Sequence, residues 1–150
     1  MIRNDLTLVS RIGTVIAPSI MQVESYATVH QLVSTVKSEL RENLNAVDGI
    51  MGCFPPGSMT GAPKLRSMEI LETLEGIPRG AYSGIFGYLS VTGSSQFNVV
   101  IRSAVFDWKS CSVSVGAGGA IVSDSSPEDE WDEMLLKSNS VLKTLNQFYS

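Results

Sequence analysis

A change of hydrophobic period near Gly76 and Pro78 does most to limit the folds open to this chain. Before it, apolar residues within 65–75 recur at helical spacing, and glycine and proline are typical residues for ending such a helix. After it, the pattern becomes that of strands divided by the turn signals TGSS and DWKS. We therefore predict a helix with a Leu/Met core stripe, followed by an antiparallel meander of three strands at residues 81–91, 96–106 and 111–117.

Two further stretches read as helices. Residues 27–42 place apolar side chains at i, i+3, i+4, i+7 and i+11, which is typical of an amphipathic helix. A last helix is expected after Ser126, a good cap, with Pro127 and acidic residues in its first turn. The expected fold class is α+β, an antiparallel sheet flanked by helices.

Composition excludes several classes of function. With 150 residues and 43% hydrophobic content, the chain is large enough for one domain with a core. A net charge of −4 without a basic cluster argues against nucleic-acid binding, and no apolar run is long enough for a membrane span. Neither a secretory signal nor a metal-type cysteine pair is visible, so a reducing compartment, the cytoplasm, is expected.

Residues 55–64, PPGSMTGAPK, lead directly into the helix at 65–75. Free backbone N–H groups at a helix start bind anions, and Ser58, Thr60 and Lys64 add hydroxyls and positive charge. The alternative is an ordinary loop with a good helix cap. The stretch 116–125, GAGGAIVSDS, again exposes bare backbone after a strand, and two such loops favour a shared acidic ligand.

Three charged residues of the last helix share one face. Glu130, Glu133 and Lys137 stand at i, i+3 and i+7. Two carboxylates on one face can hold Mg²⁺ in part, together with water and substrate oxygens. The alternative is a helix start rich in acids with an ordinary Glu–Lys pair.

Three further residues have both a structural and a functional interpretation. His30, the only histidine, lies at the edge of the apolar face of the helix predicted at 27–42 and suits either packing or acid–base work. Arg102 is expected inside a strand, where a ligand carboxylate or a protein carboxylate such as Glu69 or Glu72 would pair with it. Tyr82 begins the first predicted strand and suits packing equally well.

Several motifs occur together in one order along nearly the whole chain. The combined pattern resembles the C-terminal part of the chorismate-utilising enzymes and is most similar to their aminodeoxychorismate synthase (para-aminobenzoate synthase) branch. The anthranilate synthase branch is the alternative within the family. The motifs are IRNDL, VESYATVHQLVSTV, GSMTGAPKLRSMEIL, RGAYSGIFGYLS, IRSA, GAGGAIVSDS and EDEWDE.

The resemblance implies a site that binds chorismate with Mg²⁺, amination by ammonia from a glutamine amidotransferase partner or fused domain, and a product for folate biosynthesis. It also implies a role for each matching residue. The catalytic positions are His30 and Lys137, the substrate-binding positions are Ser58, Thr60, Tyr82, Arg102, Gly118 and Gly119, and the metal positions are Glu130 and Glu133.

The resemblance covers about the last third of the family's module, so residues 1–150 are expected to be its C-terminal part. The upstream lysine proposed as a nucleophile and the upstream glutamates that share the Mg²⁺ have no counterpart in this sequence. We therefore expect the chain alone to be inactive and prone to association through an exposed edge. A non-catalytic module that retains the fold stays open as an alternative, and a plant protein of this kind would reside in the plastid.

Overall fold

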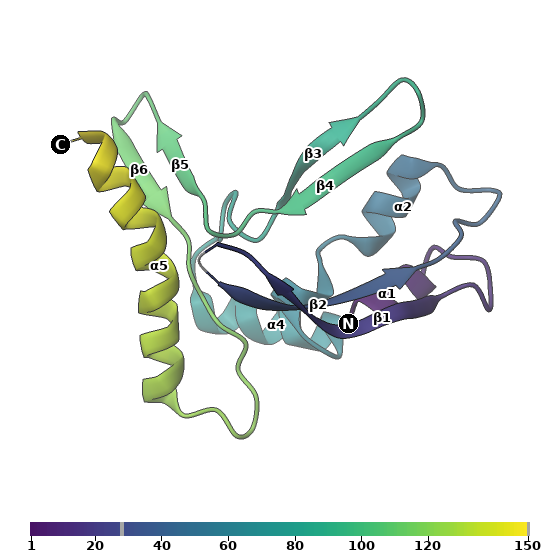
Figure 1. Ribbon diagram of the computed structural model, residues 1–150, viewed down its shortest axis with the longest axis horizontal. Coiled ribbons are helices and arrows are strands. Elements are labelled where there is room, and N and C mark those ends of the chain that lie inside the picture. Colours follow the sequence, from purple (N-terminus) through teal and green to yellow (C-terminus); the bar gives the residue numbers. More distant parts are fainter. Residues whose placement is uncertain (28, 150) are drawn as a thin grey trace. The chain divides into compact units, whose positions relative to one another are not determined.

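The structure is a computed structural model that describes residues 1–27 and 29–149, and it alternates helices with antiparallel hairpins (Figure 1). This composition confirms the α+β class. The elements in chain order are α1 (Ile2–Thr7), β1 (Ile16–Ser25), β2 (His30–Lys37), α2 (Ala46–Cys53), α3 (Gly57–Thr60), α4 (Lys64–Glu75), β3 (Ile85–Leu89), β4 (Ser95–Val99), β5 (Ala104–Asp107), β6 (Ser112–Val115) and α5 (Pro127–Tyr149).

The chain divides into two compact units. The first comprises Met1–Ile77 and Leu89–Ser95, and the second comprises Pro78–Tyr88 and Gln96–Ser150. Val9, which is 6% exposed, is the one buried hydrophobic residue among those the structure describes. The small core of the first unit is therefore centred on this valine, and backbone hydrogen bonds from Arg11 to Glu39 and from Arg41 to Val9 hold the segments around it.

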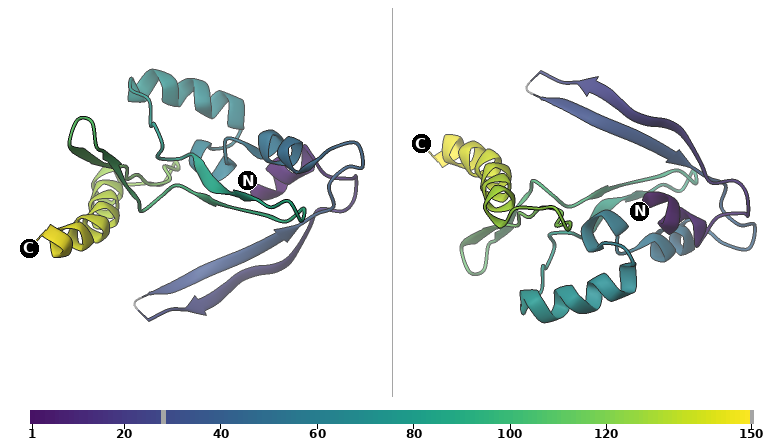
Figure 2. Two further views of the ribbon diagram at one scale, coloured as in Figure 1. Left: turned by 90° about the horizontal axis from the view of Figure 1, so that it is seen from above. Right: turned by 90° about the horizontal axis from the view of Figure 1, so that it is seen from below.

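The first unit contains a long ribbon of two strands where a helix was expected. β1 and β2 pair antiparallel, with Val23 opposite Leu32 and Ser25 opposite His30. The prediction of a helix at 27–42 was wrong, because β-branched residues and a partner strand at 16–25 outweigh a spacing that also fits a helix. Figure 2 shows the ribbon running clear of the helices of its unit over most of its length.

The helix that follows the PPGSMTGAPK segment is present and ends as predicted. α4 stops at Gly76, which adopts the left-handed conformation at φ 66°. Its apolar stripe does not form a core, since none of its residues is buried and Leu65 and Leu74 are largely exposed. The assignment of this stripe to the core was therefore wrong: nothing in the described residues covers these side chains.

The strands of the second half form two hairpins rather than a meander of three. β3 pairs with β4, and β5 pairs with β6. The second predicted strand breaks at 100–103, where Arg102 has a φ of 51° and Ile101 N–H bonds to the carbonyl of Val99. A non-glycine residue in the left-handed region ends an extended strand. The two predicted turns, at TGSS and DWKS, are confirmed as the hairpin ends.

The last helix follows the sequence closely. α5 begins at Pro127, and the Ser126 hydroxyl accepts a hydrogen bond from the Asp129 N–H at 3.4 Å. Acidic residues fill its first turn as predicted. Among the described helices, none is long and apolar enough to cross a membrane.

A charged cradle at the start of the last helix

Three side chains of α5 converge on Gly118 and Gly119 within the second unit. Lys137 Nζ donates to the Gly118 carbonyl at 3.3 Å and forms an ion pair with Glu133 Oε1 at 2.8 Å. Glu130 Oε2 lies close to Gly119. Residues 116–126 form the connection from β6 to α5, and its Gly118 and Gly119 lie against the charged face of the helix.

Gly119 leaves open the space between these charged groups. A Cβ atom on Gly119 would lie 2.9 Å from Glu130 Oε2, 3.8 Å from Glu133 Oε2 and 3.9 Å from Lys137 Nζ. Any side chain at this position would therefore occupy the point on which the three groups converge. We call the space bounded by these four residues the cradle.

One carboxylate oxygen of the cradle is without a partner. Ser125 Oγ donates to Glu130 Oε1 at 2.6 Å, which fixes the direction of the carboxylate. Glu130 Oε2 is buried and has no hydrogen-bond partner among the described residues. A buried, unpaired carboxylate oxygen is costly, so this atom is suited to receive a cation or a donor group.

The charge of Glu133 depends on its neighbours. The hydrogen bond from Lys137 and then its positive charge lower the pKa of Glu133; desolvation opposes them, and Arg102 adds a weaker lowering effect. The carboxylate is therefore held ionised. The stability that this pairing contributes is present above the ordinary carboxyl pKa and is lost as the pH falls through the lowered pKa.

Replacing Lys137 is expected to move the titration of Glu133. In Lys137→Met the pKa of Glu133 should rise to its ordinary value or slightly above it, because the desolvation that remains outweighs the charge of Arg102. An NMR titration of the side-chain carboxyl carbon measures this directly. Lys143→Met, on an exposed part of the same helix, should leave the titration unchanged. An unaltered Glu133 pKa in Lys137→Met would contradict the pairing.

Tyr82 borders the same loop. Its ring packs against the backbone of Gly116, and its hydroxyl lies 3.2 Å from the position that a Cβ of Gly118 would take. The prediction that Tyr82 lies in a strand was wrong, since β3 begins at Ile85. The structure nevertheless places the Tyr82 hydroxyl beside Gly118.

Arg102 lies at the break between β4 and β5, not within a strand as predicted. Its expected protein partners also differ: Glu69 pairs with Arg66 at 2.8 Å, whereas the charge of Arg102 acts on Glu133. The left-handed backbone turns Arg102 out of the strand, and its side chain is exposed.

The other predicted site residues lie in the first unit. His30 is at the start of β2, and its Nδ1 is 3.0 Å from Ser25 Oγ across the ribbon. Ser58 and Thr60 lie on α3, where Thr60 Oγ1 donates to the Pro56 carbonyl at 3.2 Å and Ser58 is exposed. Among the described residues, no hydrogen bond joins His30 to either hydroxyl.

Lys64 does not act as the free cation expected from the sequence. Its ammonium forms an ion pair with Asp5 Oδ1 at 2.6 Å, and both side chains are mostly buried. Sequence reasoning missed Asp5, although it lies within the IRNDL motif. Its partner is 59 positions away, and no local pattern indicates so distant a contact.

The chain is similar in sequence to known proteins along most of its length. The family described as chorismate binding enzyme matches residues 1–143. The chain is 47% identical over 150 residues to "Aminodeoxychorismate synthase, chloroplastic" of Arabidopsis thaliana, covering 100% of this chain and 16% of that protein. It is 43% identical over 143 residues to "Anthranilate synthase component 1" of Methanothermobacter marburgensis, covering 95% and 31%.

A solved structure has the same fold. Anthranilate synthase component I from Streptococcus pneumoniae TIGR4 superimposes with a TM-score of 0.77 at 34% identity, over 93% of this chain and 32% of that one. The chain thus spans between about a sixth and a third of the length of these relatives.

Proposed function

Because the chain belongs to the chorismate binding enzyme family, we propose that it forms part of an aminodeoxychorismate synthase, which converts chorismate and ammonia to 4-amino-4-deoxychorismate. The observation that carries the proposal is the convergence of Glu130, Glu133 and Lys137 on Gly119, in a chain whose family match runs from residue 1 to 143. Identity to a relative of that name is higher than to the anthranilate synthase relative.

Hydrogen-bond donors and a positive charge beside the cradle suit a dianionic substrate. Chorismate carries two carboxylates and a ring hydroxyl. The Arg102 guanidinium and the N–H groups of Gly118 and Gly119 are donors of the kind that orient carboxylates, and Tyr82 adds a hydroxyl beside them. In the proposed reaction the C4–O bond breaks, a C4–N bond forms with ammonia, and the hydroxyl leaves as water.

The same residues fit a magnesium ion. Glu130 Oε2 is buried and unpaired, and the Glu133 carboxylate faces the same space across Gly119. The described residues contain no group of three His, Cys, Asp or Glu side chains able to hold a metal, and Mg²⁺ commonly uses one or two carboxylates with water and substrate oxygens. Bound there, the ion would supply Lewis-acid polarisation of a substrate carboxylate.

Roles follow for the remaining residues. Lys137 holds Glu133 ionised and presents an ammonium to the substrate, while Glu130 is oriented by Ser125. Ser58 is exposed and free to meet a substrate oxygen. His30 is the chain's only imidazole and the proposed acid–base group near the leaving hydroxyl. A glutamine amidotransferase, as subunit or fused domain, would deliver the ammonia.

Product analysis tests the proposal. A protein that contains this chain within a complete module should yield 4-amino-4-deoxychorismate from chorismate, ammonia and Mg²⁺, as detected by mass spectrometry. Anthranilate as the product would instead assign the chain to the anthranilate branch, to which the second relative points. Absence of any product would leave a non-catalytic module.

A further inference from the structure

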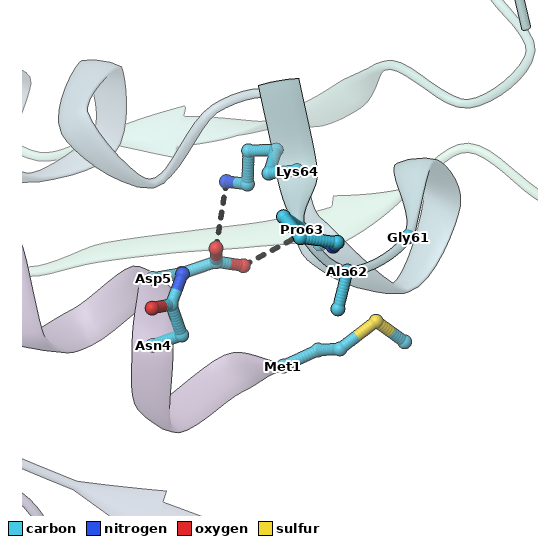
Figure 3. Close-up of a pocket in the computed structure, with 8 residues that line it drawn as sticks. Met1, Asn4, Asp5, Gly61, Ala62, Pro63 and Lys64 are labelled. Carbon is cyan, nitrogen blue, oxygen red and sulfur yellow. Dashed lines mark hydrogen bonds and ion pairs between the residues drawn. The ribbon is translucent and has the colours of Figure 1, made fainter. Parts of the chain in front are cut away.

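One buried carboxylate in α1 holds both ends of the segment that carries Ser58 and Thr60. Asp5 is 5% exposed. Its Oδ1 pairs with Lys64 Nζ at 2.6 Å (Figure 3). Its Oδ2 accepts a hydrogen bond from the Gly57 N–H at 2.8 Å. A hollow of about 270 Å³ lies beside these groups, between α1 and the segment 57–64.

Lys64 occupies a position that needs a compensating charge. It is the first residue of α4, where the helix dipole disfavours a cation. Its side chain is mostly buried, and its ammonium also donates to the Cys53 carbonyl at 3.3 Å. Asp5 supplies the negative charge that this buried ammonium requires, so Lys64 joins α1 to the chain on both sides of α3.

Gly57 allows the carboxylate to approach the backbone. A Cβ at this position would lie 2.8 Å from Asp5 Oδ2 and 3.2 Å from Met1 Cβ, closer than side chains normally pack. α3 has four residues, too few to hold its own conformation, and Pro56 before it offers no side-chain cap. Asp5 therefore provides, from another helix, the acceptor that a capping side chain would normally provide.

We propose that Asp5 is a positioning residue: through Gly57 and Lys64 it fixes α3, and with it the orientation of Ser58 and Thr60 towards the substrate, without touching the substrate itself. The role of Asp5 towards the substrate rests on the proposed function. The contacts of Asp5 within the first unit are independent of the proposed function. We call the three residues Asp5, Gly57 and Lys64 the clamp.

Cys53 offers a direct probe of the clamp. Burial and then the negative charge of Asp5 raise the pKa of the Cys53 thiol, while Lys64 lowers it. In a Cys111→Ser background, which leaves Cys53 as the only thiol, the pH profile of alkylation should shift to lower pH in Asp5→Asn and to higher pH in Lys64→Met. Simple loosening of the structure would shift both variants to lower pH, and that outcome would overturn the clamp.

Hydrogen exchange tests the bond to α3. The Gly57 amide should exchange about tenfold faster or more in Asp5→Ala, because a hydrogen bond to a charged acceptor is lost. Glu39→Gln is the matched control, since it removes a carboxylate of the same unit from an exposed pair with Arg11 and should leave this amide unchanged. Unchanged exchange in Asp5→Ala would also overturn the clamp.

Kinetics of the protein with a complete module test the positioning of substrate. Asp5→Asn should raise the KM for chorismate about 10- to 100-fold with a smaller change in kcat, and Glu39→Gln should behave as wild type. A wild-type KM in Asp5→Asn, together with faster Gly57 exchange in Asp5→Ala, would show that the clamp exists but plays no part in substrate binding. That result would overturn the inference.

If the wild-type protein turns over no chorismate, the proposed function fails, and the substrate role of Asp5 fails with it. The exchange and alkylation measurements then still decide the clamp.

Discussion

The 150-residue chain by itself is expected to convert no chorismate, and activity should appear when the rest of an aminodeoxychorismate synthase module is supplied. The chain spans 16% of one such relative and 32% of the superimposed anthranilate synthase component I. Its cradle contains two candidate metal carboxylates, which would hold Mg²⁺ only together with water and substrate oxygens.

The accessible surface supports this expectation. The chain exposes 11,622 Å². A compact monomer of its mass would expose roughly 7,500 Å², and even two separate compact units of half that mass would together expose roughly 9,000 Å². Large apolar side chains such as Leu65, Leu74 and Ile20 account for part of the excess. These surfaces are of a kind that a further protein segment covers.

Complementation of cells that require para-aminobenzoate is the decisive assay. The chain alone should give no growth, and the chain with the portion of a relative that it lacks should restore growth. Glu133→Gln should abolish this rescue through the cradle. Leu74→Glu should abolish it through the exposed stripe of α4 while leaving thermal unfolding of the isolated chain unchanged, since Leu74 is 76% exposed. Growth supported by the unaided chain would contradict the prediction.

Local sequence signals predicted the parts of the fold that local interactions determine. Ser126 and Pro127 mark the start of α5, and Gly76 marks the end of α4, because caps and left-handed glycines act within a few residues. The cradle was also predictable in part, since Glu130 and Glu133 share a face at helical spacing.

Two of the errors, at residues 27–42 and at Lys64, come from contact between distant segments. The apolar spacing at 27–42 fits a helix, but pairing with β1 makes residues 30–37 a strand. The break at Arg102 depends on a single left-handed residue that no turn signal announces. Asp5 and Lys64 attract each other across 59 positions, and the charge of each taken alone suggested a different role.

Closing the cradle with one methyl group is expected to weaken the binding of chorismate and Mg²⁺ strongly. In Gly119→Ala the added Cβ would lie 2.9 Å from Glu130 Oε2, so the carboxylate must turn away from the space it faces. Gly119 does not adopt a left-handed φ, so alanine causes no backbone strain there. The variant therefore separates function from stability: thermal unfolding should change little.

The expected loss follows from the contacts displaced. A charge-assisted contact is worth about 1.5–3 kcal/mol, so Gly119→Ala should reduce affinity about 10- to 100-fold and Gly119→Val should reduce it further. Calorimetry on the protein with a complete module measures both ligands. Gly93→Ala is a control with the opposite expected effects on stability and binding. Gly93 has a φ of 88°, and no atom lies near its Cβ position. It should lower stability by about 1 kcal/mol through backbone strain and leave binding intact. In Gly119→Val, an isopropyl group would fill the space between Glu130, Glu133 and Lys137. If this variant bound chorismate and Mg²⁺ with wild-type affinity, both ligands would have to bind outside the cradle.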